Sequence, residues 1–234
     1  MARRAEAVVE RRDPLDRERV LRAAIDLADR EGIDGLSMRN LARELGVEAM
    51  SLYHYVESKE DLLSALGDMV MREIELPEAR PAEWKSAIRR MAVSYHAALG
   101  RHAWYHSLKP VPSRVGLRTL AYMEWTLGTL RRGGFSARMT HHAYHILDSH
   151  VVGSSQWESG ILAALPKGKL ADLAKSVLER IPIAEFPYMH EHTQQHIGGA
   201  TKGDKHPFEL GLDLILEGLD RLRDERPKPR RTKA

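Results

Sequence analysis

Apolar residues recur at intervals of three and four along most of this chain, the spacing that places them on one face of a helix. One such stripe runs through residues 20–28, and another runs through residues 62–74. No segment alternates apolar and polar residues convincingly with the period of two that indicates a half-buried strand. The pattern therefore predicts an all-α protein in which helices cover most of the chain.

Glycine and proline residues divide this pattern into separate helices, because both residue types interrupt helical structure. Asp13 and Pro14 are expected to start the first helix, and Gly32 to end it. Ser58 with Asp61 resembles a capping box that opens a later helix. The helices expected beyond residue 81 span residues 82–99, 102–109, 113–132, 136–160, 167–181 and 207–224, with a long connection over residues 182–206 that has room for one short helix.

Residues 37–59 have the pattern of a helix-turn-helix. Leu41 and Leu45 lie four apart and share one helical face, and Gly46 can supply the left-handed residue that ends the helix. Leu52 then gives the second helix an inward face. A small residue beside an apolar one, followed by a glycine turn, suits two helices that cross steeply at short distance. Such a pair can place its second helix in the major groove of DNA.

The chain resembles the N-terminal domain of the TetR family of bacterial transcriptional regulators from Leu15 to Leu66, through the residues LDRERVLRAAIDLADREGIDGLSMRNLARELGVEAMSLYHYVESKEDLLSAL. A second, shorter stretch, FELGLDLILEGL, is similar to the last helix of the tetracycline-repressor branch of that family. The resemblance implies a three-helix DNA-binding head joined to a larger helical body for ligand binding and dimerisation. The corresponding ranges are residues 13–60 for the head, residues 61–225 for the body, and residues 1–12 and 226–234 for two basic tails.

The resemblance also implies a mechanism. Two copies pair through a four-helix interface and bind a palindromic operator as a homodimer, and a small-molecule effector releases the repressor from the DNA. In this chain the natural apolar seam on the last helix is Leu212, Ile215, Leu216, Leu219 and Leu222, with the helix at residues 136–160 as its partner. The sequence names neither the operator nor the effector, and it does not separate a repressor from an activator.

Several side chains of the head are candidates for DNA contact. Arg39 lies one turn into the first helix of the pair, and its forked guanidinium can bind guanine or a phosphate. Tyr53 and Lys59 match family positions that hold backbone phosphates, and Lys59 adds its charge to a helix N-terminus. The full expected set is Ser37, Met38, Arg39, Ala49, Met50, Ser51, Tyr53, His54 and Lys59.

A polar stripe in the body gives candidates for an effector site. His141, Tyr144, His145, Asp148 and Val152 follow one another at steps of three and four, in a helix expected to be largely buried. Buried polar groups need partners, so these residues either line a ligand cavity or form a network at a subunit interface. With the preceding helices, the candidate effector-binding residues are His106, Tyr122, Met123, Thr126, Tyr144, His145 and Asp148.

Composition narrows the function classes. The 234 residues are 43% hydrophobic and include no cysteine, which excludes disulfides, thiolate metal sites and cysteine nucleophiles. No apolar run is long enough to span a bilayer and the N-terminus has no secretory pattern, so the cytoplasm is the expected location. The formal net charge is +3, but the two tails carry +2 and +5, so the body between them is acidic. The N-terminal tail could add DNA contacts, whereas the C-terminal tail is expected to be disordered.

Other chemistry finds little support in the sequence. His141 and His145 lie four apart, as metal ligands on a helix do, but no HExxH motif is present. The sequence also has no glycine-rich phosphate loop, no nucleophile elbow and no credible acid pair. We therefore expect no catalytic residues, no metal and no cofactor, and the alternatives left open are a helical metal-binding protein or enzyme that uses the histidine pair, and a regulator without an effector.

Overall fold

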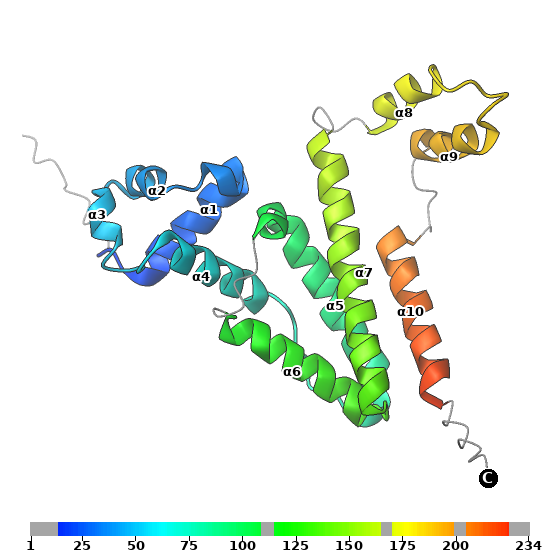
Figure 1. Ribbon diagram of the computed structural model, residues 1–234, viewed down its shortest axis with the longest axis horizontal. Helices are drawn as coiled ribbons and strands as arrows, with labels where there is room; N and C mark the ends of the chain where they lie inside the picture. The colour runs from blue at the N-terminus through cyan, green and yellow to red at the C-terminus, as the bar shows by residue number, and fades with distance from the viewer. Residues whose placement is uncertain (1–13, 109–114, 165–169, 199–204, 225–234) are drawn as a thin grey trace, which may run out of the picture. The chain divides into compact units, whose positions relative to one another are not determined.

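The computed structural model describes residues 14–108, 115–164, 170–198 and 205–224, and the regular elements in these ranges are all helical (Figure 1). This confirms the all-α prediction. The chain divides into two compact units, Met1–Leu66 and Gly67–Ala234. The functional division predicted after residue 60 stays a prediction. Both basic tails lie outside the described residues.

The first unit contains α1 (Arg17–Gly35), α2 (Met38–Leu45), α3 (Ala49–Leu52) and the start of α4 (Lys59–Arg72). The expected helix start at Asp13 and Pro14 is wrong, because α1 begins at Arg17 and Asp16 accepts a hydrogen bond from the Arg19 backbone N–H at 2.8 Å. Gly32, which was expected to end the helix, has φ 74° and forms a kink, and α1 continues beyond it to Gly35. The core of this unit is Val20, Leu21, Ala24, Ile25, Leu27, Ala28, Leu36, Leu41, Ala42, Leu52, Val56, Leu62 and Leu66.

The second unit is a larger set of helices. After α4 come η1 (Pro81–Glu83), α5 (Trp84–Arg101), η2 (Ala103–Ser107), α6 (Leu117–Arg132), α7 (Ala137–Ala164), α8 (Leu170–Leu178), α9 (Pro187–Gly198) and α10 (Pro207–Asp224). Helix α5 packs against α6, α7 and α10, and α7 also packs against α6 and α10, while α8 and α9 pack against each other. Residues 182–206, which were expected to form a long connection with room for one short helix, contain the 12-residue helix α9.

Two glycines explain how α6 joins α7 so tightly. A Cβ atom at Gly133 would lie 2.8 Å from Cγ of the buried Trp84 ring, so no larger residue fits there. Gly134 follows with φ 97°, a conformation that favours glycine. The ring of Trp84 also meets Phe135 edge to face at 4.8 Å, which fixes the start of α7 against α5.

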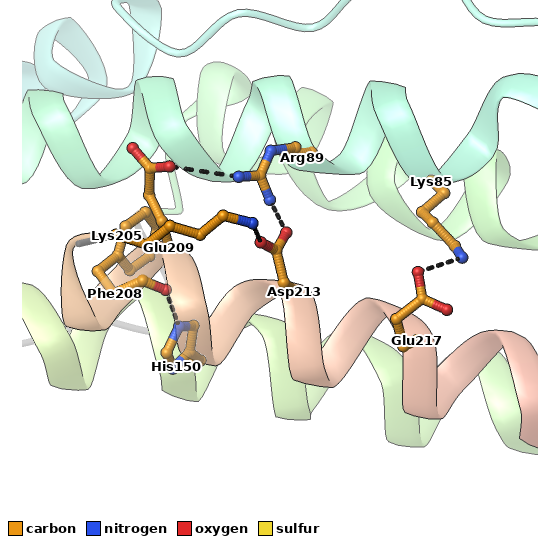
Figure 2. Close-up of polar contacts among 8 residues, drawn as sticks. All are labelled: Lys85, Arg89, His150, Lys205, Phe208, Glu209, Asp213 and Glu217. Atoms are coloured by element: carbon orange, nitrogen blue, oxygen red, sulfur yellow. Dashed lines mark hydrogen bonds and ion pairs between the residues drawn. The ribbon is translucent and has the colours of Figure 1, made fainter. Parts of the chain in front are cut away.

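Charged side chains hold α10 along α5 (Figure 2). Arg89 pairs with Glu209 at 3.3 Å and also with Asp213, whose second oxygen takes Lys205 at 2.7 Å. Lys85 extends this seam one turn further by pairing with Glu217 at 3.0 Å (Figure 2). The pKa of Asp213 lies below its usual value, chiefly because Lys205 donates a hydrogen bond to its carboxylate. The positive charges of Arg89 and Lys205 lower it further.

On the other side of α10, Nε2 of His150 in α7 donates a hydrogen bond to the Phe208 carbonyl oxygen at 2.9 Å (Figure 2). A Cβ atom at Gly211 would lie 2.5 Å from the His150 ring, so the two helices approach closely at this glycine.

None of the helices in the described ranges combines the length and the apolar composition that a membrane-spanning segment requires.

Candidate DNA interface and effector site

The helix-turn-helix is built as the local signals predicted. Ser37 precedes α2 and its hydroxyl accepts a hydrogen bond from the Asn40 backbone N–H at 3.1 Å. Gly46 ends α2 in the left-handed conformation, with φ 67° and ψ 37°. Leu41 and Leu52 are fully buried, so α2 and α3 meet through their inward faces. The turn between the two helices therefore follows from one capping residue, one glycine and two leucines.

The second helix of the pair is short. Helix α3 covers only Ala49–Leu52, after which the N–H groups of Tyr53, His54 and Tyr55 each donate to the carbonyl three residues back. The tighter winding continues the helix direction for one more turn. Glu48 directly precedes α3, and its side chain makes no capping hydrogen bond.

The predicted DNA-contact residues lie on α2, α3, the turn after α3 and the start of α4. Met50 is 72% exposed, which is unusual for a methionine in a compact unit and leaves its side chain free to meet base edges. The exposed members are Arg39, Met50, Tyr53, His54 and Lys59, and the partly buried members are Ser37, Met38, Ala49 and Ser51.

Sequence reasoning missed one supporting residue of the head. Arg17, the first residue of α1, donates a hydrogen bond from Nε to the Tyr55 carbonyl oxygen at 3.2 Å. Its guanidinium also lies 3.6 Å from the Asp61 carboxylate in the first turn of α4. Arg17 therefore connects the start of α1 both to the turn that follows α3 and to the start of α4. No local pattern could have found it, because its partners lie far along the chain.

In the larger unit, Asp148 of α7 and Tyr122 of α6 form a partly buried polar contact. The Tyr122 hydroxyl donates to Oδ1 of Asp148 at 3.1 Å. Burial raises the pKa of Asp148, although the hydrogen bond from Tyr122 and the nearby His145 act in the opposite direction. Thr126 is fully buried, and its hydroxyl donates to the Tyr122 carbonyl at 2.8 Å, which satisfies it within α6.

Two tyrosines that the sequence reasoning did not select belong to the same cluster. Tyr95 of α5 is buried and meets the Tyr122 ring edge to face at 5.2 Å. Its hydroxyl lies near that of Tyr105 in η2. The ring centroid of Tyr144 in α7 lies 6.3 Å from that of Tyr122. A tyrosine within the apolar stripe of α5 was the available signal, since a buried hydroxyl needs a polar partner.

The expectation of a largely buried polar stripe on α7 is wrong for its two histidines. His141 and His145 are exposed in the subunit, with their rings 4.6 Å apart, whereas Tyr144 and Asp148 are partly buried. The described residues include no group of three side chains placed to hold a metal ion. His106 of η2 lies closer to the interior, where its Nε2 is 3.1 Å from the Ser155 hydroxyl and burial lowers its pKa.

A hollow of about 390 Å³ opens beside α7 and the start of α10. It contains none of the predicted effector residues. Its lining is Ser149, His150, Gly153, Ser154, Trp157, Glu158, Pro207 and Phe208. It lies next to the exposed Trp157, so this face of α7 carries a large apolar side chain that the single subunit leaves uncovered.

The predicted dimer seam on α10 requires correction. Leu212, Leu216 and Leu219 are buried in the core of their own subunit. The large apolar residues of α10 that remain exposed are instead Leu210 and Leu214, at 51% and 68%, together with the C-terminal Leu222 of the predicted seam. Ile146 and Trp157 are the exposed large apolar residues of the described part of α7. Helix α10 therefore has two apolar faces, of which the core covers one.

An interaction at the end of α4 ties this helix to α6. Oδ1 of Asp68 accepts a hydrogen bond from the Arg118 backbone N–H at 3.0 Å, which caps the N-terminus of α6. A Cβ atom at Gly116 would lie 2.0 Å from the same oxygen, so glycine is needed for this approach. At Gly67, the residue before Asp68, a Cβ atom would lie 3.8 Å from the Tyr105 ring, so Tyr105 also reaches α4.

Comparison with known proteins gives two family matches that together cover most of the chain. Residues 20–66 match the family described as bacterial regulatory proteins, tetR family. Residues 76–223 match the tetracyclin repressor-like C-terminal domain. The helix-turn-helix and the larger helical unit thus match the two parts of one kind of protein.

Individual relatives agree with this. The chain is 32% identical over 213 residues to the HTH-type transcriptional repressor DrrR1 of Streptomyces coeruleorubidus, which covers 88% of this chain and 77% of the relative. It is 32% identical over 212 residues to the class D tetracycline repressor protein of Escherichia coli, covering 88% and 89%. The structure of Streptomyces coelicolor ActR in complex with actinorhodin superposes with a TM-score of 0.71 at 30% identity, over 91% of this chain and all of the other.

Proposed function

The chain belongs to the TetR family of bacterial transcriptional regulators, and from this premise we propose that it is a homodimeric repressor that leaves a palindromic operator when a small molecule binds its larger unit. The family binds DNA and acts in transcription, and it is not a family of enzymes. The observation that carries the proposal is the helix-turn-helix itself, with its capped α2, its left-handed Gly46 and the exposed side chains of Met50, Tyr53 and His54.

The first test is operator binding. Fragments of the source genome that the purified protein retains should share a palindrome, because a two-fold dimer presents two recognition helices to two half-sites. Affinity should fall steeply with salt, with a log–log slope of several units, since each phosphate contact releases a counterion. Titrations at several salt concentrations measure this slope. Weak binding at about 150 mM salt without sequence preference would contradict the proposal.

Arg39 and Lys59 are expected to have separable roles. Arg39→Ala should cost about 1–3 kcal/mol at one base pair of each half-site and relax the preference there, because a bidentate guanine contact is lost. Lys59→Ala should weaken binding to all sequences alike and reduce the salt slope by about one, because one phosphate contact is lost. Profiles over a library of operator variants measure both effects.

A matched control for these variants is Arg22→Ala, which removes an exposed arginine of α1 that pairs with Glu18. It should leave both the sequence profile and the salt slope near those of the unchanged protein. Identical profiles for Arg39→Ala and Lys59→Ala would show that the two roles are wrongly assigned.

The proposed effector site is the region around Tyr122 and Asp148. The polar contact between the buried Tyr122 and the partly buried Asp148 supports it, because removing polar groups from water costs free energy. The relative ActR has been solved with actinorhodin and with (S)-DNPA bound. A route to α4 is present in the Asp68 cap of α6 and in the Tyr105 ring beside Gly67. An effector that shifts these contacts would favour the state of the protein that binds operator weakly. By linkage, bound operator would lower the affinity for the effector by the same factor as the effector lowers the affinity for operator.

A further inference from the structure

We propose that Asp148, with the four tyrosines Tyr95, Tyr105, Tyr122 and Tyr144, is an anchor for a positively charged nitrogen, so that the effector is an organic monocation with an apolar body. This inference rests on the proposed function and specifies the chemistry of its effector. The five side chains come from α5, η2, α6 and α7, which pack against one another.

The four tyrosines lie close enough to Asp148 to interact with its charge. Tyr122 and Tyr95 are buried and meet edge to face at 5.2 Å, and Tyr144 adds a third ring 6.3 Å from that of Tyr122. Tyr105 and Tyr144 are only partly buried, and so is Asp148, so the cluster reaches the surface of the unit on one side. Aromatic faces attract ammonium groups, and cages of such rings are a common means of binding them.

The charge of the cluster is unbalanced. No lysine or arginine among the described residues forms an ion pair with Asp148, whose hydrogen-bond partner is the neutral Tyr122 hydroxyl. Burying an ionised carboxylate without a cation is costly, and burial accordingly raises its pKa. The neighbouring His145 is exposed, so solvent weakens its influence. A cation that entered the cluster would supply the missing charge, whereas an anion would add to the imbalance.

The site selects more than charge. The tyrosine rings near Asp148 belong to or pack against the apolar core of this unit, and such aromatic surface suits an apolar ligand body. In the free protein the Tyr122 hydroxyl occupies one carboxylate oxygen. A cationic ligand must displace or share this hydrogen bond, so Tyr122 competes with the ligand for Asp148. This competition gives the two residues opposite expected effects on binding.

The test uses two small probes of equal shape on the full-length protein. Phenyltrimethylammonium is a cation, and tert-butylbenzene is its neutral isostere. Calorimetric titration should show that the unchanged protein prefers the cation by about tenfold or more, given the usual strength of cation–π and charge contacts. Asp148→Asn should bring the ratio of the two affinities close to one. Glu124→Gln, which removes an exposed carboxylate from α6, should leave the ratio unchanged.

A second variant keeps the proposal testable if Asp148→Asn does not fold. Tyr122→Phe retains the ring and removes the competing hydroxyl, so the cation should bind a few times more tightly while the neutral probe is unaffected. A purely structural role for the cluster would instead weaken both probes alike. Equal binding of the two probes to the unchanged protein would overturn the proposal, and so would equal binding of benzenesulfonate, an anion of similar size.

Operator binding is measured separately in the same preparations. A protein that binds its operator but shows no preference for the cation overturns the anchor and leaves the repressor function intact. A protein that prefers the cation but binds no operator supports the anchor and overturns the repressor function.

Discussion

Leu214→Glu is expected to turn the dimer into monomers and to weaken operator binding by roughly a hundredfold or more, since an interface anchor is typically worth about 2–4 kcal/mol. Leu214 is 68% exposed on α10, in line with Leu210 one turn earlier. In a two-fold interface the substitution occurs twice and faces the same patch of the partner. Burying those carboxylates without partners is costly, and a monomer holds only one half-site.

Two measurements check this result. Sedimentation or light scattering at micromolar concentration gives the assembly state, and operator titration gives the affinity. Leu117→Glu is the matched control, because Leu117 is exposed at the start of α6, away from α10. It should remain dimeric and bind operator normally. A Leu214→Glu protein that is still a dimer with full affinity would place the interface on another face of the subunit.

The helix-turn-helix could be predicted well because its signals are local. Ser37 caps the helix that follows it, and Gly46 is the residue that adopts the left-handed conformation, so neither depends on distant parts of the chain. The length of α3 was harder to predict. Whether Tyr53 continues an α-helix or enters tighter turns depends on packing beneath the segment, which one side chain's propensity does not determine.

The partners of apolar faces could not be predicted from spacing. Periodicity shows that a face of α10 is apolar, but it does not show whether the core or another subunit covers it. Helix α10 has leucines on two faces, and the sequence reasoning assigned the buried face to the dimer. On α7 the opposite error occurred, because His141 and His145 were expected inside and lie exposed.

The polar cluster around Asp148 shows the same limit in another form. The sequence placed Asp148 and Tyr144 on one helix face, because that relation is local. It did not reveal Tyr95 or Tyr105, which reach the cluster from α5 and η2. Only the packing of these elements against α6 and α7 brings the hydroxyls together. Contacts between distant segments are therefore where the structure adds most.

Leu212→Ala is expected to lower the free energy of unfolding by about 2–5 kcal/mol, the usual cost of removing a buried leucine side chain. Leu212 is 0% exposed in the core formed with Phe208, Leu216 and their neighbours on α5 and α7. The loss combines the lost burial of its methyl groups with the cavity left behind. Denaturant titration at one fixed protein concentration measures it, because the unfolding of a dimer depends on concentration.

Leu120→Ala is the control, since this leucine is exposed on α6 and contributes little to the core. It should change the unfolding free energy by less than about 1 kcal/mol, as most exposed positions do. The decisive comparison is with Leu214→Glu, only two residues away from Leu212. If α10 has one face for the core and one for the partner, Leu212→Ala destabilises a subunit that still dimerises, and Leu214→Glu dissociates a subunit that still folds. If the Leu212→Ala protein kept normal stability but no longer dimerised, Leu212 would belong to the dimer interface and not to the core of its own subunit.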